Sequence, residues 1–204
     1  MLVIFVRHAE TGLSKTHQLP GTELSGIGVK QANLLSARLK ELKTYAIVSS
    51  SYERAIQTAN VLSKNLNVPV QYSELFNEIK KPSEFNGKQH GRREGMDYFK
   101  RAVEHAEDPT WHYSDEENYT EIKDRAMKAI EYLIGMKKDH VVVISHGTMI
   151  KTIVAIGVFG SDIDIVALRK FYKAFTTENT GITECEMDGN GTFKVLRFND
   201  HSHL

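Results

Sequence analysis

Two short apolar runs, far apart in the chain, constrain the fold most. Residues 2–6 (LVIFV) and 141–144 (VVVI) each predict a strand, and the β-branched second run is typical of burial on both faces of a sheet. Arg7-His8 follows the first run, and Ser145-His146-Gly147 follows the second. Because open α/β sheets hold ligands where strands end in polar loops, we expect both histidines and the arginine at one sheet edge.

Strand and helix patterns alternate along the rest of the chain. This order predicts a three-layer α/β/α sandwich with a mostly parallel central sheet of about six strands. Ser50 or Ser51 is the expected N-cap of the second helix. The predicted strands are 2–6, 45–49, 68–72, 141–145 and a closing hairpin of 182–187 and 192–198, and the predicted helices are 25–42, 52–65, 119–136 and 149–158.

The segment 80–118 interrupts this alternation and is rich in charge. We interpret residues 1–204 as a single domain in which this segment is an insertion over the C-terminal edge of the sheet, partly helical near 93–106. Such an insertion is a typical place for substrate selectivity. Its basic run, 88–93, could contact a second phosphate or form an ordinary solvated surface. It is poor in large apolar residues, so we expect it to seal the site badly; those it has are Phe85, Met96, Tyr98, Phe99 and Trp111.

Composition excludes several classes of protein. The 204 residues carry a formal net charge of zero, which gives no bulk attraction to nucleic acid or to an anionic membrane. No apolar run approaches the roughly 18 residues of a membrane span. With no signal-peptide pattern and a single cysteine, Cys185, we expect a cytoplasmic protein. The oligomeric state is not predicted.

His8 and Arg7 form the first candidate for chemistry. A neutral imidazole can attack phosphorus, and its usual pKa of about 6.5 leaves it mostly unprotonated at neutral pH. A histidine at a strand end can equally be structural. Arg7 favours the functional interpretation, because a guanidinium forks onto two phosphate oxygens and this one has no obvious acidic partner in the sequence.

Arg54 and His146 each follow a strand and lie near the start of a predicted helix. An arginine in a first helical turn opposes the helix dipole, and a bound anion would resolve that conflict; pairing with Glu53 at the surface is the alternative. The Ser145-His146 pair also suggests a serine hydrolase, but the G-x-S-x-G motif of that class is absent.

A leaving group needs a proton donor, and Glu74, Glu78 and Glu84 are the carboxylates close to the predicted edge. Glu78 follows the third predicted strand and precedes the insertion, so it could face the pocket, although it could also be a solvated surface residue. Metal binding is a competing use for nine histidines, yet their spacing matches no ligand motif and no cysteine pair exists. We therefore expect no metal and no cofactor.

Taken in order, these residues resemble the histidine phosphatase superfamily, the phosphoglycerate-mutase-like proteins. Arg7-His8-Ala9-Glu10-Thr11 is similar to the family's Arg-His-Gly-Glu-Ser/Thr signature. The resemblance extends over nearly the whole chain, through 24–32 (LSGIGVKQA), 49–59 (SSSYERAIQTA), 76–79 (FNEI), 179–182 (NTGI) and the tail 199–204.

The resemblance implies a role for each candidate. His8 would be the nucleophile; Arg7, Arg54 and a cationic His146 would hold the phosphoryl oxygens; and Glu78 would protonate the leaving group and then activate water. Many relatives have a phosphate-binding asparagine where this chain has Ser14, and the segment after the acid, 80–87, also departs from the family.

The expected function is a metal-independent phosphomonoester phosphatase that acts through a phosphohistidine on a small phosphorylated substrate or a phosphoprotein. The alternatives are a cofactor-dependent phosphoglycerate mutase, which must shield its phosphohistidine from water, and an inactive module that binds phosphorylated ligands.

Overall fold

A six-stranded sheet forms the centre of the computed structural model, which describes residues 1–13, 17–42, 44, 46–88, 92–105 and 107–204. The strand order is β3-β2-β4-β1-β5-β6. The first four of these strands are parallel, whereas β5 and β6 form an antiparallel hairpin. The strands are β1 (Leu2–Arg7), β2 (Ala46–Ser49), β3 (Val70–Tyr72), β4 (His140–Ser145), β5 (Ile182–Met187) and β6 (Phe193–Asp200).

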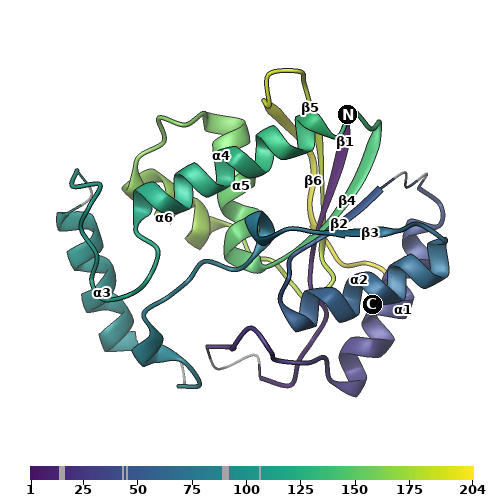
Figure 1. Ribbon diagram of the computed structural model, residues 1–204, viewed down its shortest axis with the longest axis horizontal. Helices are drawn as coiled ribbons and strands as arrows, with labels where there is room; N and C mark the ends of the chain where they lie inside the picture. Colours follow the sequence, from purple (N-terminus) through teal and green to yellow (C-terminus); the bar gives the residue numbers. More distant parts are fainter. Residues whose placement is uncertain (14–16, 43, 45, 89–91, 106) are drawn as a thin grey trace.

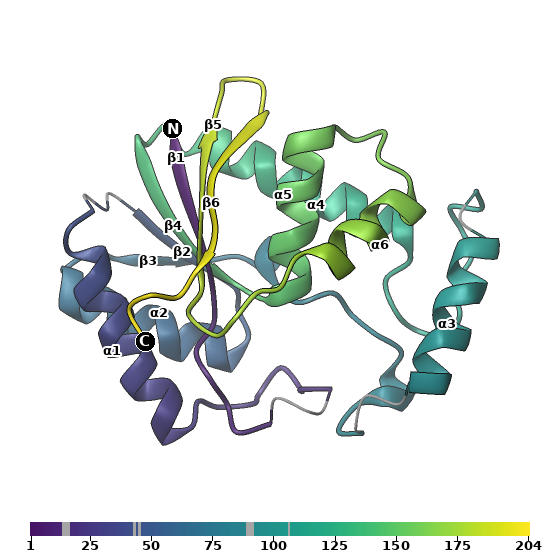
Figure 2. The ribbon, with the colours of Figure 1, turned by 180° about the vertical axis from the view of Figure 1, so that it is seen from behind.

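Helices cover both faces of this sheet. Helices α1 and α2 lie on one face and α4 and α5 on the other, with α6 packed against α5 (Figures 1 and 2). This arrangement confirms the predicted α/β sandwich. The helices are α1 (Gly26–Leu39), α2 (Glu53–Leu66), α3 (Arg92–Glu104), α4 (Tyr119–Gly135), α5 (Gly147–Phe159) and α6 (Ile165–Ala174), and two short 3₁₀ turns are η1 (Glu74–Phe76) and η2 (Ser83–Phe85).

The central strands are apolar throughout because both of their faces are buried. In β1, Ile4 and Val6 pack with the α1 and α2 side chains, whereas Val3 and Phe5 pack with those of α4 and α5. Successive strand side chains point to opposite faces, so a strand between two helical layers needs apolar residues at every position. The continuous runs in the sequence reflect this requirement.

The start of α2 differs from the prediction. Neither Ser50 nor Ser51 caps it: Tyr52 occupies the N-cap position and makes no side-chain capping bond. Both serine hydroxyls instead donate to Asn77 Oδ1, at 2.7 and 3.1 Å. Asn77 comes from beyond β3, so this competing partner is a tertiary feature that the local pattern does not reveal.

Helix α6 was not predicted. Its N-cap, Asp164, accepts a hydrogen bond from the Ala167 amide at 2.7 Å, and Leu168 is its fully buried residue. A short helix with one buried position gives only a weak helical periodicity of apolar residues. The sequence therefore does not distinguish this helix from the end of α5 before it.

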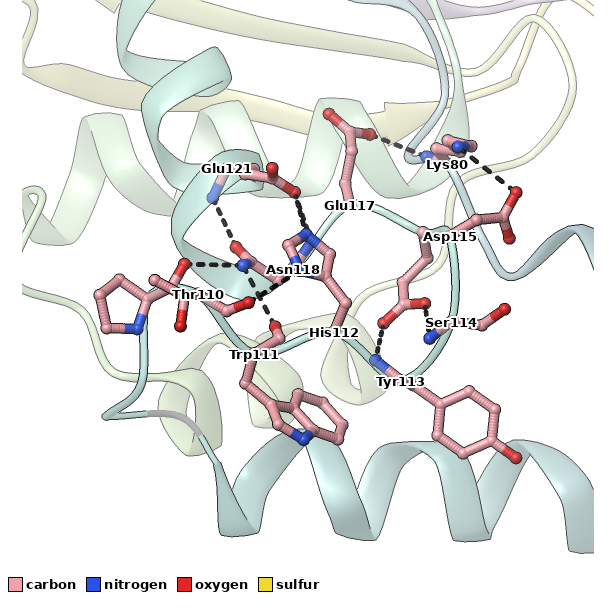
Figure 3. Close-up of polar contacts among 12 residues, drawn as sticks. Lys80, Thr110, Trp111, His112, Tyr113, Ser114, Asp115, Glu117, Asn118 and Glu121 are labelled. Carbon is pink, nitrogen blue, oxygen red and sulfur yellow. Dashed lines mark hydrogen bonds and ion pairs between the residues drawn. The ribbon is translucent and has the colours of Figure 1, made fainter.

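The insertion between β3 and β4 places α3 at one side of the molecule, apart from the layers (Figures 1 and 2). Its return to α4 is fixed by polar contacts (Figure 3). Glu117 accepts the Lys80 amide at 2.8 Å and pairs with both sides of the Arg125 guanidinium, and Asn118 and Glu121 form a capping box at the start of α4. Within the described residues, no helix is long and apolar enough to cross a membrane.

Gly28 sets the distance between α1 and the loop that follows β1. A Cβ atom at this position would lie 2.0 Å from the carbonyl oxygen of Glu10, two residues after His8. Gly26, also in the first turn of α1, has nothing within 4 Å of the corresponding point. The two glycines lie in the same helix turn, but only Gly28 packs against the loop after β1.

We predict that Gly28→Ala lowers the free energy of unfolding by about 2 kcal/mol, because the added methyl group must push α1 off the loop. Gly26→Ala is the matched control, and helix propensity predicts no loss and a gain of up to about 1 kcal/mol. Urea unfolding of both variants measures the difference. Equal stabilities would show that this close approach does not constrain the loop.

Candidate active site

The predicted site residues meet at the C-terminal ends of the parallel strands. Arg7 ends β1 opposite Ser145, the last residue of the adjacent strand β4. The His8 amide donates to the Ser145 carbonyl at 2.9 Å, and Asn179 Nδ2 donates to the His8 carbonyl at 2.8 Å. The strand order thus brings Arg7-His8 and Ser145-His146 side by side, although they are far apart in sequence.

His8 is buried and held in one tautomer. Its Nδ1 lies 2.8 Å from the Ala9 carbonyl oxygen, which can only accept, so Nδ1 carries the proton. Nε2 then has a free lone pair and accepts a hydrogen bond from Arg54 Nε at 3.1 Å. Burial lowers the pKa of His8 well below its usual value, and the charges of Arg54 and Arg7 add to this effect. The imidazole is therefore neutral at physiological pH, as a nucleophile must be.

Arg54 is buried rather than at the surface, with a relative exposure of 2%. It lies in the first turn of α2, as predicted, and donates from Nη1 to the Leu19 carbonyl at 3.0 Å. The alternative of an ion pair with Glu53 does not occur, since Glu53 accepts from Gln57 Nε2 instead. Burial lowers the pKa of Arg54, and the nearby Glu78 raises it.

Arg7 approaches the same place from β1. Its Nη1 donates to the Thr177 carbonyl at 2.6 Å, and its pKa is lowered by burial and raised by Glu78 and Glu178. Gly147 packs beside it, since a Cβ there would lie 3.7 Å from Arg7 Cδ and 2.7 Å from Thr177 Oγ1. Among the described residues, no carboxylate lies within ion-pair distance of either Arg7 or Arg54.

His146 is fully buried, and its ring centre lies 5.1 Å from that of His8. Its Nε2 is 2.7 Å from Ser50 Oγ. The single Ser50 hydroxyl proton is directed to Asn77 Oδ1, so Ser50 must accept from His146, and Nε2 carries the imidazole proton. The other nitrogen, Nδ1, is buried and has no partner within the described part of the chain. It is therefore the one ring nitrogen of His146 that makes no hydrogen bond there.

His146 is expected to be cationic when it holds a phosphoryl group, and its environment in the fold acts against that charge. Burial lowers its pKa well below the usual value, and the charges of Arg54 and Arg7 lower it further, as would a proton on His8. The structure therefore holds His146 neutral. The resemblance alone did not reveal this, because the pKa depends on how closely these cations are packed.

Glu78 lies at the N-terminus of α5. Its Oε1 accepts from the Met149 amide at 3.1 Å and from the Ile79 amide at 3.0 Å, and its Oε2 accepts from the Thr148 amide at 3.3 Å. The helix that begins after His146 thus orients the carboxyl group by its free N–H groups.

A cavity of about 630 Å³ has Arg7, His8, Arg54 and Glu78 in its wall. His146 is fully buried and does not line it, although its neighbours Gly147 and Thr148 do. The other two acidic candidates are elsewhere: Glu74 and Glu84 are exposed and do not line it. Ser14 lies outside the described residues, as do residues 89–91 of the basic run 88–93.

Several residues of this site were missed from the sequence. Lys151 and Tyr172 line the cavity, Asn77 and Ser50 fix the tautomer of His146, and Asn179 holds the His8 carbonyl. Ser50 and Asn179 fall in segments that resemble the family, but no local pattern assigns them these partners. The position of Lys151, one turn into the helix after His146, was an available signal.

The described residues contain no group of three or more His, Cys, Asp and Glu side chains arranged to hold a metal ion. The metal independence of the reaction stays a prediction. The cluster of positive charge at the site comes from Arg7 and Arg54.

Comparison with known proteins agrees with this geometry. Residues 3–201 match the family model of the histidine phosphatase superfamily (branch 1). A probable phosphatase of Schizosaccharomyces pombe is 31% identical over 214 residues, covering 100% of this chain and 95% of the relative.

Solved structures share the fold. A phosphoserine phosphatase of Entamoeba histolytica superposes with a TM-score of 0.79 at 24% identity, over 100% of this chain and 98% of the other. A mycobacterial glucosyl-3-phosphoglycerate phosphatase superposes with a TM-score of 0.78 at 20% identity, over 97% and 98% of the two chains. The chain belongs to the histidine phosphatase superfamily, branch 1, and is a phosphatase.

Proposed function

We propose that this chain hydrolyses small phosphomonoesters through a phosphohistidine on His8. The observation that supports this most is the contact between Arg54 Nε and His8 Nε2 at 3.1 Å, with Nδ1 bonded to the Ala9 carbonyl. This arrangement leaves one basic nitrogen in the cavity, beside a guanidinium that can move from the ring onto a phosphoryl oxygen. Phosphoryl transfer depends mainly on positioning and charge stabilisation, which the buried Arg54 and the half-buried Arg7 would supply.

In the first step, the His8 Nε2 lone pair attacks phosphorus. A P–N bond forms, the P–O ester bond breaks, and the protonated Glu78 gives its proton to the departing alkoxide. In the second step, water attacks the phosphohistidine and transfers a proton to Glu78. The P–N bond breaks, inorganic phosphate leaves, and both side chains return to their starting states.

His146 would change its charge during this cycle. Its unpartnered Nδ1 is the nitrogen available to a phosphoryl oxygen, but as a neutral imidazole it offers a lone pair there. A phosphoryl dianion next to the ring raises the pKa of His146 and favours protonation at Nδ1. The added proton supplies a donor to the anion, so the cationic form accompanies the bound phosphoryl group.

Three of the relatives found are named as phosphatases, which favours hydrolysis over the mutase and the inactive-module alternatives. Two of them are named for phosphoserine and for a glucosyl phosphoglycerate, both small phosphorylated molecules. We extend only that class of substrate to this chain.

A single-domain organisation and a cytoplasmic location, both expected from the sequence, belong to the same proposal.

We predict that purified protein releases inorganic phosphate from 4-nitrophenyl phosphate in the presence of a chelator, and that His8→Ala lowers kcat by at least about 1,000-fold because no other group can accept the phosphoryl. His201→Ala, an exposed histidine near the chain end, is the control and keeps wild-type activity. Activity of His8→Ala within tenfold of wild type would refute the mechanism. Interconversion of phosphoglycerates without phosphate release would establish the mutase instead.

A second prediction concerns Glu78. In the phosphoryl-transfer step, measured as the burst of released alcohol, Glu78→Gln should slow an alkyl phosphate about 100-fold or more but 4-nitrophenyl phosphate less than tenfold. Only the alkoxide leaving group needs a proton. Glu84→Gln, an exposed carboxylate outside the cavity, is the matched control and should change neither rate. An equal loss of rate for both esters would show that a group other than Glu78 protonates the leaving alkoxide.

A further inference from the structure

A second cavity adjoins the catalytic one and extends toward the insertion. Its volume is about 450 Å³, which is in the range of pockets that hold small molecules. The two cavities share wall residues, among them Ile79, Lys81, Lys151, Tyr172 and Lys173. A group bonded to a phosphoryl at His8 can therefore reach the second cavity past these shared residues.

Several aromatic side chains line this second cavity, which we call the aromatic cavity. They come from separate elements: Phe85 from η2, Tyr98 and Phe99 from α3, Trp111 from the return loop and Tyr172 from α6. In Figure 3, Trp111 extends from that loop toward the helix below it, and its ring stacks on His105, the residue after α3, with centroids 4.6 Å apart. Phe85 and Tyr98 meet edge to face at 6.2 Å.

These contacts hold the aromatic rings in the wall of the cavity and do not fill its interior. The insertion was expected to seal the site badly because it has few large apolar residues. Four of the five that were named, Phe85, Tyr98, Phe99 and Trp111, line the aromatic cavity, whereas Met96 is 67% exposed outside it. They form a binding wall beside the reaction site.

Three lysines stand where the two cavities join. Lys81 and Lys151 are half-buried and Lys173 is exposed, and none of the three forms an ion pair within the described residues. Lys151 Nζ donates to the carbonyls of Tyr172 and Phe175, at 3.0 and 3.4 Å, which leaves one of its three N–H bonds available. The charge of Glu78 acts on Lys151, but three ammonium groups still leave an excess of positive charge, which favours an anion at this junction.

The acidic residues that line the aromatic cavity already accept hydrogen bonds or ion pairs, and Asp108 accepts from the amide and the hydroxyl of Thr110, at 2.9 and 2.7 Å. Glu116 accepts from the amides of Tyr113 and Ser114, at 2.7 and 2.8 Å, and Glu117 is paired with Arg125. These bonds hold both carboxylates in the return loop. They are not available to neutralise the lysines.

We propose that the substrate is a phosphomonoester whose leaving alcohol carries a large apolar body and, between that body and the ester, a second anionic group. The apolar body would occupy the aromatic cavity, and the anion would contact Lys81, Lys151 and Lys173. This inference rests on the proposed phosphatase function and specifies its substrate class. An alcohol as small as serine or glycerate would leave the aromatic cavity empty.

Four derivatives of phosphoserine separate the two requirements: the N-acetyl and N-naphthoyl acids, and the C-terminal amide of each. We expect the N-naphthoyl acid to have the highest kcat/KM, with a loss of at least about tenfold when either the naphthoyl group or the carboxylate is removed. Equal values for all four would overturn the proposal while leaving the phosphatase function intact. Failure to hydrolyse any of the four, or 4-nitrophenyl phosphate, would refute both.

Two variants assign these effects to the two regions. Ala102→Trp, which fills the aromatic cavity from α3, should abolish the preference for naphthoyl over acetyl, whereas Met96→Trp on the same helix should preserve it. Lys173→Ala should reduce the preference for acid over amide, whereas Lys170→Ala, also exposed on α6, should not. Preferences that survive in both Ala102→Trp and Lys173→Ala would overturn the assignment.

Discussion

The site depends on two arginines, Arg54 buried and Arg7 half-buried, that have no carboxylate at ion-pair distance within the described residues. Removing a guanidinium from water is costly, and a partner carboxylate usually offsets that cost. Here Arg7 and Arg54 are held mainly by backbone carbonyls, those of Thr177 and Leu19. The scaffold of parallel strands and packed helices must supply the remaining stability. In return it leaves positive charge free for an incoming phosphoryl group, and it keeps His8 neutral and nucleophilic.

Hydrogen bonds to neutral groups fix which nitrogen of each histidine ring carries the proton. The Ala9 carbonyl fixes the His8 proton on Nδ1, and the chain from His146 through Ser50 to Asn77 fixes the other ring's proton on Nε2. His8 therefore presents the Nε2 lone pair as a nucleophile, and His146 has one ring nitrogen, Nδ1, that makes no hydrogen bond. Neither state needs a charged partner, which is why burial is compatible with both.

Much of the fold could be predicted from the sequence because strands buried on both faces leave an unmistakable apolar run. Arg7, His8 and His146 follow directly, since each comes immediately after such a run. The start of α2 could not be predicted, because the hydroxyl of Ser50 bonds to Asn77 and His146 from distant parts of the chain. The aromatic cavity was equally inaccessible: the composition of the insertion showed few apolar residues but not that they would line one wall.

The central claim is that the phosphoryl group passes through His8, and trapping that intermediate tests it most directly. The protein is mixed with excess 4-nitrophenyl phosphate, quenched with alkali within milliseconds and digested, and the phosphorylated peptide is identified by mass spectrometry. The account predicts an acid-labile phosphoryl group on His8, approaching one per chain in Glu78→Gln because water is then activated slowly. Turnover by wild-type protein with the phosphoryl group on another residue, or with none in either protein, would contradict it.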